Sequence, residues 1–206
     1  MLCRLKTTLV ISVFAGLSTF ANADFILKTY DGTASGVDKG NSQTLGGGGA
    51  AGTYLDRQFT VTSTFQLEKA SLWMFGTAGM DMYIKIARDS AGSPGSILET
   101  FRTTFTGMTP QDYVMNSPTH ALITPGKYHF LIGGESTNTN DRWFLNLVAD
   151  NHLTDMYFLH SDGSFNGPFQ LPEIATTLQG SPVPEPAVML GLGLGSLALV
   201  RKRRQK

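Results

Sequence analysis

The sequence predicts an all-β protein: an antiparallel β-sandwich (jelly-roll-like) ectodomain, flanked by an N-terminal signal peptide and a C-terminal single transmembrane helix. Between residues 54 and 160, short segments of alternating apolar and polar residues recur at a spacing of roughly ten residues. Gly, Pro, Asn and Asp turns separate these segments, and no window of a dozen residues there has a convincing helical stripe. Many short strands without helices are typical of a β-sandwich.

The N-terminus has the three parts of a signal peptide. Arg4 and Lys6 precede an apolar run over residues 9–20, and Ala21 and Ala23 supply the small-x-small pattern that signal peptidase reads. We expect cleavage after Ala23 and export of residues 24–206 by the general secretion machinery. A retained N-terminal membrane helix is the alternative, and the short run followed by a cleavage site argues against it.

The exported domain is predicted over residues 24–182, which leaves 159 residues for one hydrophobic core. The chain has one cysteine, Cys3, which the cleavage removes, so the mature fold cannot use disulfides. The domain has nine Lys and Arg residues against fifteen Asp and Glu residues. This negative balance argues against nucleic-acid binding, which needs a basic surface.

Two elements open the domain. Residues 25–30 form a short predicted strand, and residues 31–52 are predicted to be a mobile glycine-rich surface loop because their small side chains bury little area. A phosphate-binding loop is the alternative for Gly46, Gly47, Gly48 and Gly49. No Gly-Lys-Ser/Thr follows them and no helix begins there, which argues against it.

The clearest strand is residues 82–88, where Met82, Ile84 and Ile86 share one face and Lys85 points away. Turn residues follow at 89–95. The other predicted strands cover residues 55–61, 65–69 leading into 72–75, 97–105, 142–148 and 156–160, and a hairpin joins residues 120–123 to residues 128–132 through the turn at 124–126. The predicted core residues are Phe59, Leu72, Ile84, Ile86, Tyr128, Phe130 and Phe144.

The C-terminus has three parts in a fixed order. Pro184, Glu185 and Pro186 precede an uncharged apolar run over residues 187–200, and Arg201, Lys202, Arg203 and Arg204 close it. A helix of that length spans about 21 Å, short of the ~30 Å hydrocarbon core of a bilayer. The run is nevertheless apolar on every face, and the cations act as a stop-transfer signal that belongs on the cytoplasmic side. We therefore expect residues 187–200 to enter the membrane, with residues 201–206 as a basic tail.

This ordered triple over residues 183–206 resembles the PEP-CTERM sorting signal of exported bacterial proteins. The resemblance implies that Pro184, Glu185 and Pro186 form the recognition block of an exosortase, a membrane-embedded processing enzyme. It also implies that the helix is a temporary tether, removed on processing. An ordinary C-terminal membrane anchor with a chance Pro-Glu-Pro is the alternative.

The middle of the chain resembles the choice-of-anchor β-sandwich domains that often precede this tail. The matching residues are 58–61, Leu72-Trp73, 84–87 and the turn at 89–95. The resemblance supports the fold and implies no particular activity.

Candidate site residues are few, and no catalytic or metal site is predicted. The four histidines outside the signal peptide, His120, His129, His152 and His160, have no metal-ligand spacing. Residues 161–164 pair serines with Asp162 but lack a Gly-x-Ser-x-Gly elbow, so a turn is the better interpretation.

Two groups of residues are candidates for a ligand site. Asn138, Asn140 and Asp141 and residues 150–151 supply the oxygen ligands that calcium prefers, without the spacing of a dedicated loop, and no other cofactor is predicted. Sugars stack on exposed aromatic rings, for which the candidates are Trp73, Tyr128, Trp143, Tyr157 and Phe169, although the core needs most of them.

These observations predict a non-enzymatic cell-surface or extracellular-matrix protein with a structural or adhesive role. It would be tethered at the inner membrane, processed by an exosortase, and then associated with the envelope or with exopolysaccharide. A carbohydrate-binding module is the alternative. An extracellular hydrolase has less support, because the fifteen scattered acids show no converging pair.

Overall fold

The computed structural model describes residues 24–30, 37–47, 54–134, 142–148, 153–160 and 164–184, with the backbone alone described for residues 37–47. Within these residues the protein is all-β and its strands pair antiparallel in two sheets. The predicted signal peptide and the predicted membrane helix lie outside the described part of the chain. Among the residues that are described, no helix is long and apolar enough to cross a membrane.

The first sheet, sheet A, has the strand order β1-β13-β4-β10-β2, and two further strands, β7 and β8, pair with β4. The long strand β4 organises it, because β13 and β10 follow one another along one edge of β4 while β7 and β8 pair along the other. Its strands are β1 (Asp24–Lys28), β2 (Val37–Gly47), β4 (Phe65–Gly76), β7 (Gln111–Asn116), β8 (Leu122–Ile123), β10 (Arg142–Val148) and β13 (Thr176–Pro182).

The second sheet, sheet B, has the order β12-β11-β3-β9-β5-β6. Its strands are β3 (Tyr54–Val61), β5 (Asp81–Ser90), β6 (Ser93–Thr104), β9 (Gly126–Gly134), β11 (Leu153–Leu159) and β12 (Phe165–Pro172). Strands β5 and β6 form a hairpin whose closing pair is Ser90 and Ser93. Ala91 and Gly92 between them have φ values of 54° and 87°, as a two-residue type I′ turn requires.

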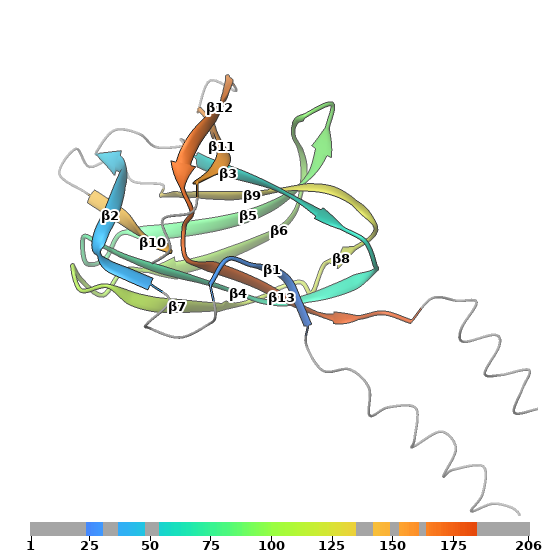
Figure 1. The fold of residues 1–206 in the computed structure, drawn as a ribbon. Helices are drawn as coiled ribbons and strands as arrows, with labels where there is room; N and C mark the ends of the chain where they lie inside the picture. Colours follow the sequence, from blue (N-terminus) through green and yellow to red (C-terminus); the bar gives the residue numbers. More distant parts are fainter. Residues whose placement is uncertain are drawn as a thin grey trace, which may run out of the picture.

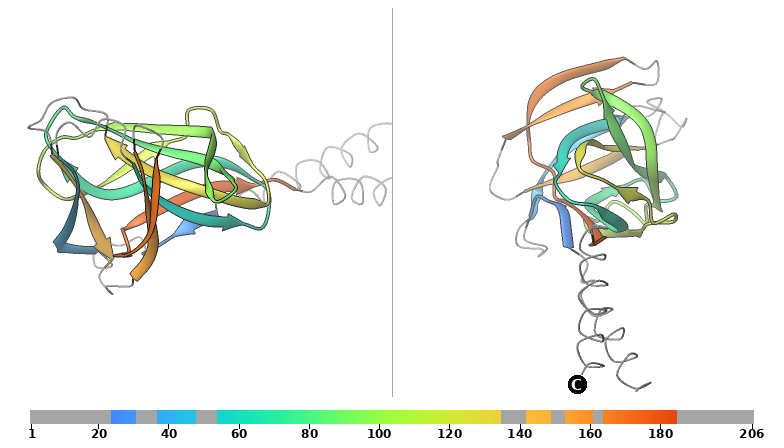
Figure 2. Two further views of the ribbon diagram at one scale, coloured as in Figure 1. Left: turned by 90° about the horizontal axis from the view of Figure 1, so that it is seen from above. Right: turned by 90° about the vertical axis from the view of Figure 1, so that its right-hand side faces the viewer.

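The two sheets pack face to face around one core, which confirms the predicted β-sandwich (Figures 1 and 2). Sheet B contributes Ile84, Ile86 and Phe130, and sheet A contributes Leu67, Leu72 and Leu178, all at most 1% exposed. Alternation explains this: Ile84 faces Ile132 and Phe101, and Ile86 faces Phe130, so each inward residue meets an apolar partner. The connections from β3 to β4, β4 to β5, β6 to β7 and β8 to β9 all cross between the sheets. The jelly-roll variety of sandwich stays a prediction.

Six of the seven predicted core residues are buried in this cluster: Phe59, Leu72, Ile84, Ile86, Tyr128 and Phe130. The seventh, Phe144, is a wrong prediction. It is half-buried beside Trp143 and Leu145, which do join the core, and its ring stacks on Phe75 with centroids 4.8 Å apart. Because neighbouring strand residues alternate between faces, the choice of Trp143 for the core excludes Phe144.

The predicted hairpin over residues 120–132 is also wrong. Strand β8 pairs with β4 in sheet A, through Leu122 with Gln66 and Ile123 with Phe65. Strand β9 pairs with β3 and β5 in sheet B. The turn at residues 124–126 therefore carries the chain from one sheet to the other instead of folding it back on itself. A Pro-Gly turn has the same local sequence in both cases.

Part of the predicted glycine-rich loop is a strand. Val37–Gly47 pairs with β10 at the edge of sheet A, from Val37 opposite Val148 to Gly47 opposite Arg142, with two irregularities in register. Glycine lowers strand propensity, but backbone hydrogen bonds to an existing strand do not need side chains. Residues 31–36 and 48–52 of the predicted loop lie outside the described residues.

Candidate functional site

The predicted sorting tail leaves the domain directly from strand β13. The last three residues of β13 pair with β4: Gly180 with Leu67, Ser181 with Gln66 and Pro182 with Phe65. Pairing continues past the strand, since the backbone N–H of Val183 donates to the carbonyl of Thr64 at 2.9 Å. Pro184, the first residue of the predicted recognition block, follows immediately and is exposed.

The position of Pro182 suits this exit. Hydrogen-bonded and non-hydrogen-bonded residue pairs alternate along an antiparallel ladder. Val183 and Thr64 are a hydrogen-bonded pair, because the N–H of Val183 donates to the carbonyl of Thr64. Pro182 and Phe65 then form a non-hydrogen-bonded pair, in which the missing N–H of proline costs nothing.

The predicted mature N-terminus lies beside the exit. It begins β1, which lies beside β13 in sheet A (Figure 1). Asp24 is opposite Gly180 of β13. A Cβ atom at Gly180 would lie 2.6 Å from the carbonyl oxygen of Gln66 and 2.9 Å from Cδ1 of Ile26. Glycine therefore lets β13 fit between β1 and β4, and the two predicted targeting segments join the domain at one end of sheet A.

The remaining predicted targeting residues lie outside the described part of the chain. They are Ala21 and Ala23 of the cleavage site, Glu185 and Pro186 of the recognition block, and the stop-transfer cations Arg201, Lys202, Arg203 and Arg204. Their roles stay predictions.

The predicted ligand residues are not brought together in the described structure. Asn138, Asn140, Asp141 and residues 150–151 lie outside it, and Trp143 is a core residue, 4% exposed. Of the other candidate rings Tyr128 is buried, Trp73 and Tyr157 are half-buried, and Phe169 is exposed. The described residues contain no group of three or more His, Cys, Asp or Glu side chains arranged to hold a metal ion.

The histidines differ in their surroundings. His120 lies in the segment before β8 and has a φ of 52°. Its Nδ1 is 3.0 Å from the carbonyl oxygen of Leu67 on β4. His160 is half-buried and stacks on Phe158, and His152 lies outside the described residues. His129 is different, because it is fully buried between two carboxylates.

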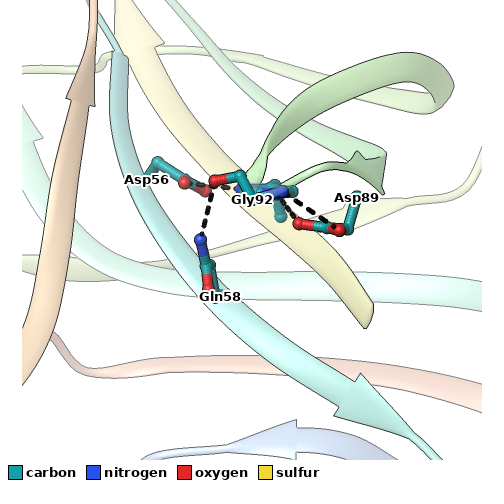
Figure 3. A network of polar contacts seen from close by, with 5 residues as sticks. Asp56, Gln58, Asp89 and Gly92 are labelled. Carbon is teal, nitrogen blue, oxygen red and sulfur yellow. Dashed lines mark hydrogen bonds and ion pairs between the residues drawn. The ribbon is translucent and has the colours of Figure 1, made fainter. Parts of the chain in front are cut away.

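His129 joins three elements on the outer side of sheet B. Its Nδ1 lies 2.6 Å from Oδ2 of Asp56 on β3, and its Nε2 lies 3.0 Å from Oδ1 of Asp89 on β5. The β5–β6 turn is fixed over the same place, because Gln58 donates from its side-chain nitrogen to the carbonyl of Gly92 at 3.2 Å (Figure 3). The Phe165 ring on β12 and the imidazole form an edge-to-face pair with centroids 6.0 Å apart.

Burial and charge oppose each other in this cluster. Burial lowers the pKa of His129, but the hydrogen bonds and charges of Asp56 and Asp89 outweigh it, so the pKa is raised overall. Burial raises the pKa of Asp56, partly offset by His129. The hydrogen bond from His129 lowers the pKa of Asp89. With both carboxylates ionised, both ring nitrogens donate and the ring is an imidazolium.

This arrangement favours holding the β5–β6 turn on sheet B over catalysis. An imidazolium that donates from both nitrogens has no free lone pair for proton abstraction or for a metal. Oδ1 of Asp56 has no hydrogen-bond partner among the described residues. A buried carboxylate destabilises the fold unless it is paired with a cation. His129 supplies that cation at the other oxygen of Asp56, Oδ2.

A second buried carboxylate has a similar holding role. Glu99 on β6 accepts hydrogen bonds from the hydroxyls of Ser117 and Thr119, from the N–H of Ala121 at 3.2 Å, and from the N–H of Thr100. Burial raises its pKa, but these four bonds outweigh burial and lower it. Glu99 therefore ties the segment before β8 to sheet B.

Sequence patterns could not identify either cluster. The alternation of Tyr128, Phe130 and Ile132 correctly places His129 on the opposite face, which predicts exposure. Asp89 and Phe165 cover His129 in the folded protein, and they are 40 and 36 residues away from it in the chain. Asp56 gave no distinctive signal, because it is opposite Leu131 in the β3–β9 pairing and reaches His129 only diagonally, while Gln58 is the residue opposite His129.

Comparison with known proteins supplies one finding for the tail. Residues 182–204 match the PEP-CTERM protein-sorting motif. No curated protein matches the chain. The matched range starts at Pro182, inside β13, so the motif and the sandwich overlap. Such a motif implies export, a membrane-anchored C-terminal sorting signal and recognition by an exosortase.

Proposed function

We propose that the protein is a non-enzymatic component of the cell surface or extracellular matrix, with a structural or adhesive role. The observation that carries the proposal is the sorting motif at residues 182–204, which begins on the last residue of the sandwich strand β13. A domain joined this closely to a sorting signal is the cargo that the signal delivers.

The proposed route follows the order of the chain. Signal peptidase cuts after Ala23, the segment 187–200 holds the exported domain at the inner membrane, and an exosortase then acts at Pro184, Glu185 and Pro186. The support is that Asp24 and Gly180 are paired, so both targeting segments join one end of the folded domain.

A passive role for the domain is supported by the way its buried charges are used. His129 lies between Asp56 and Asp89, and Glu99 accepts four hydrogen bonds from its neighbours. Arg57 on the inward face of β3 forms an ion pair with Glu173, which lies just before β13. Apart from the bond from Thr100, which is the residue next to Glu99, each of these contacts joins separate segments of the fold, as a structural element requires.

Replacing the tail cations tests the route. Each cation near an anionic membrane surface contributes ~1 kcal/mol to binding. Changing Arg201, Lys202, Arg203 and Arg204 together to Asn should lower the fraction of chain recovered in the membrane pellet. The matched control changes Lys69, Lys85, Arg88 and Lys127 of the domain to Asn in the same host. Equal membrane recovery and equal processing of the tail variant and the wild type would contradict the proposal.

Carbohydrate binding is the second candidate, and one observation favours it. Phe169 on β12 is 44% exposed, and its ring packs beside Phe158 of β11 with centroids 5.6 Å apart. An exposed ring held by a second ring is a surface on which a pyranose can stack.

A polysaccharide pull-down decides between the two roles. If the domain is a carbohydrate-binding module, Phe169→Ser should reduce retention on the host's exopolysaccharide. Leu153→Ser is the control, because Leu153 lies on the same hairpin and is similarly exposed but has no ring. Retention that is absent in the wild type, or unchanged by Phe169→Ser, would remove Phe169 as a sugar platform.

A further inference from the structure

We propose that the end of β13 restricts the sorting reaction: the processing enzyme engages Pro184, Glu185 and Pro186 only after Gly180–Val183 have separated from β4. We call these paired residues, 180–183 with 64–67, the β13 clamp. The inference rests on the proposed function, because it presumes that the tail is processed.

The basis is the absence of a spacer. Residues 181–183 are paired with residues 64–66, through the register of β13 and the hydrogen bond from Val183 to Thr64. Pro184 is the next residue. Since an extended chain advances about 3.3 Å per residue, the recognition block begins within one residue's length of the sheet.

An enzyme that binds an extended segment needs its backbone free. Such segments are commonly held by pairing with a strand of the partner. Gly180 is paired on both sides, with Asp24 of β1 and Leu67 of β4, and residues 181–183 stay paired with β4. A groove that encloses the residues just before the recognition block can therefore take them only after they leave β4.

Separation of the clamp is feasible without unfolding the domain. Pro182 and Pro184 are exposed, and Ser181 and Val183 are partly exposed. Little buried apolar area therefore becomes exposed to water when these residues separate from β4. Ser181 adds one side-chain hydrogen bond, to Glu68. The first fully buried side chain back along the strand is Leu178, which anchors the rest of β13 in the core. Strand ends with few buried contacts open locally at low free-energy cost.

A cross-strand disulfide tests the clamp directly. Gln66 and Ser181 are directly opposite, so their side chains lie on one face. By the alternation argued above they form a hydrogen-bonded pair, with Cα atoms about 5.5 Å apart, which a disulfide can bridge. The mature domain has no cysteine of its own to compete, because Cys3 precedes the predicted cleavage site. The full chain carrying Q66C and S181C is expressed in the native host, with each single variant as a control.

The second variable is a spacer of six Gly and Ser residues inserted between Val183 and Pro184. It moves the recognition block as much as about 20 Å from the sheet when extended. We expect the disulfide-bonded double variant to accumulate with its tail intact and both single variants to be processed like the wild type. Adding the spacer to the double variant should restore processing.

The outcomes separate this inference from the proposed function. Normal processing of a double variant whose disulfide is confirmed by mass spectrometry would overturn the clamp. So would a processing defect that the spacer does not relieve in a variant that melts like the wild type. An intact tail on the wild-type protein would instead contradict the proposed function itself.

Discussion

At the scale of single residues, the fold uses buried charges to hold distant segments together. His129 is the clearest case, because Asp56 and Asp89 occupy both of its ring nitrogens. A pKa raised by folding means that the folded protein binds the proton more tightly than the unfolded chain does. The stabilisation is therefore complete below the unfolded histidine pKa of about 6.5 and is lost as the pH rises through the folded value.

Urea unfolding across this pH range tests the His129 cluster. The His129 contribution should make the wild-type midpoint fall as the pH rises from 6 to 9, and His129→Asn should largely remove that slope. Because the variant leaves the buried Asp56 carboxylate without its cation, we also expect it to cost about 3–5 kcal/mol at pH 6. His160→Asn, on a half-buried ring outside the cluster, should keep the wild-type slope. An unchanged slope in His129→Asn would contradict the assignment.

Two isoleucines of sheet B test the position of the core. Ile84 is 1% exposed and faces Ile132 and Phe101, whereas Ile97 is 47% exposed. Ile84→Ala should cost about 2–5 kcal/mol, since it leaves a cavity. Ile97→Ala should stay within about 0.5 kcal/mol, as an exposed substitution does. Equal losses in the unfolding free energies of the two variants would show that the sandwich core is misplaced.

At the scale of elements, the sequence predicted strands with regular alternation and missed those without it. Met82, Ile84 and Ile86 alternate with polar neighbours, and β5 includes all of them. Strands β7, β12 and β13 were not predicted. The β13 sequence is TTLQGSP, with one large apolar residue, and it becomes a strand by pairing with β1 and β4. Local patterns cannot show such long-range pairing, nor which sheet β8 and β9 join.

The segment before β8 offers a test at this scale. Glu99→Gln should cost about 1.5–3 kcal/mol, as for lost hydrogen bonds to a charged group. The lowered Glu99 pKa implies a stability contribution that is present above the unfolded value of about 4.3 and is lost as the pH falls through the folded value. The variant should lose that part of the acid dependence in urea unfolding.

The control for Glu99 is Asp155→Asn, which changes an exposed carboxylate whose bond is to the exposed Gln170. It should lose much less stability at neutral pH. If the two variants were equally stable, Glu99 would not hold the segment at residues 117–121.

At the scale of the whole molecule, the sequence predicts domain boundaries at Asp24 and Pro182, because targeting segments have their own local composition. These boundaries stay predictions. Strand β13 ends at Pro182, where the matched sorting motif begins. The pairing of Asp24 with Gly180 could not be predicted, because it depends on the sheet topology.

The most direct test of the account is intact-mass spectrometry of the mature protein from its native host. We predict a chain that begins at Asp24, ends near Pro184, Glu185 and Pro186, and lacks residues 201–206. A mature surface protein that retains Arg201, Lys202, Arg203 and Arg204 would contradict the account and leave residues 187–200 as an ordinary membrane anchor.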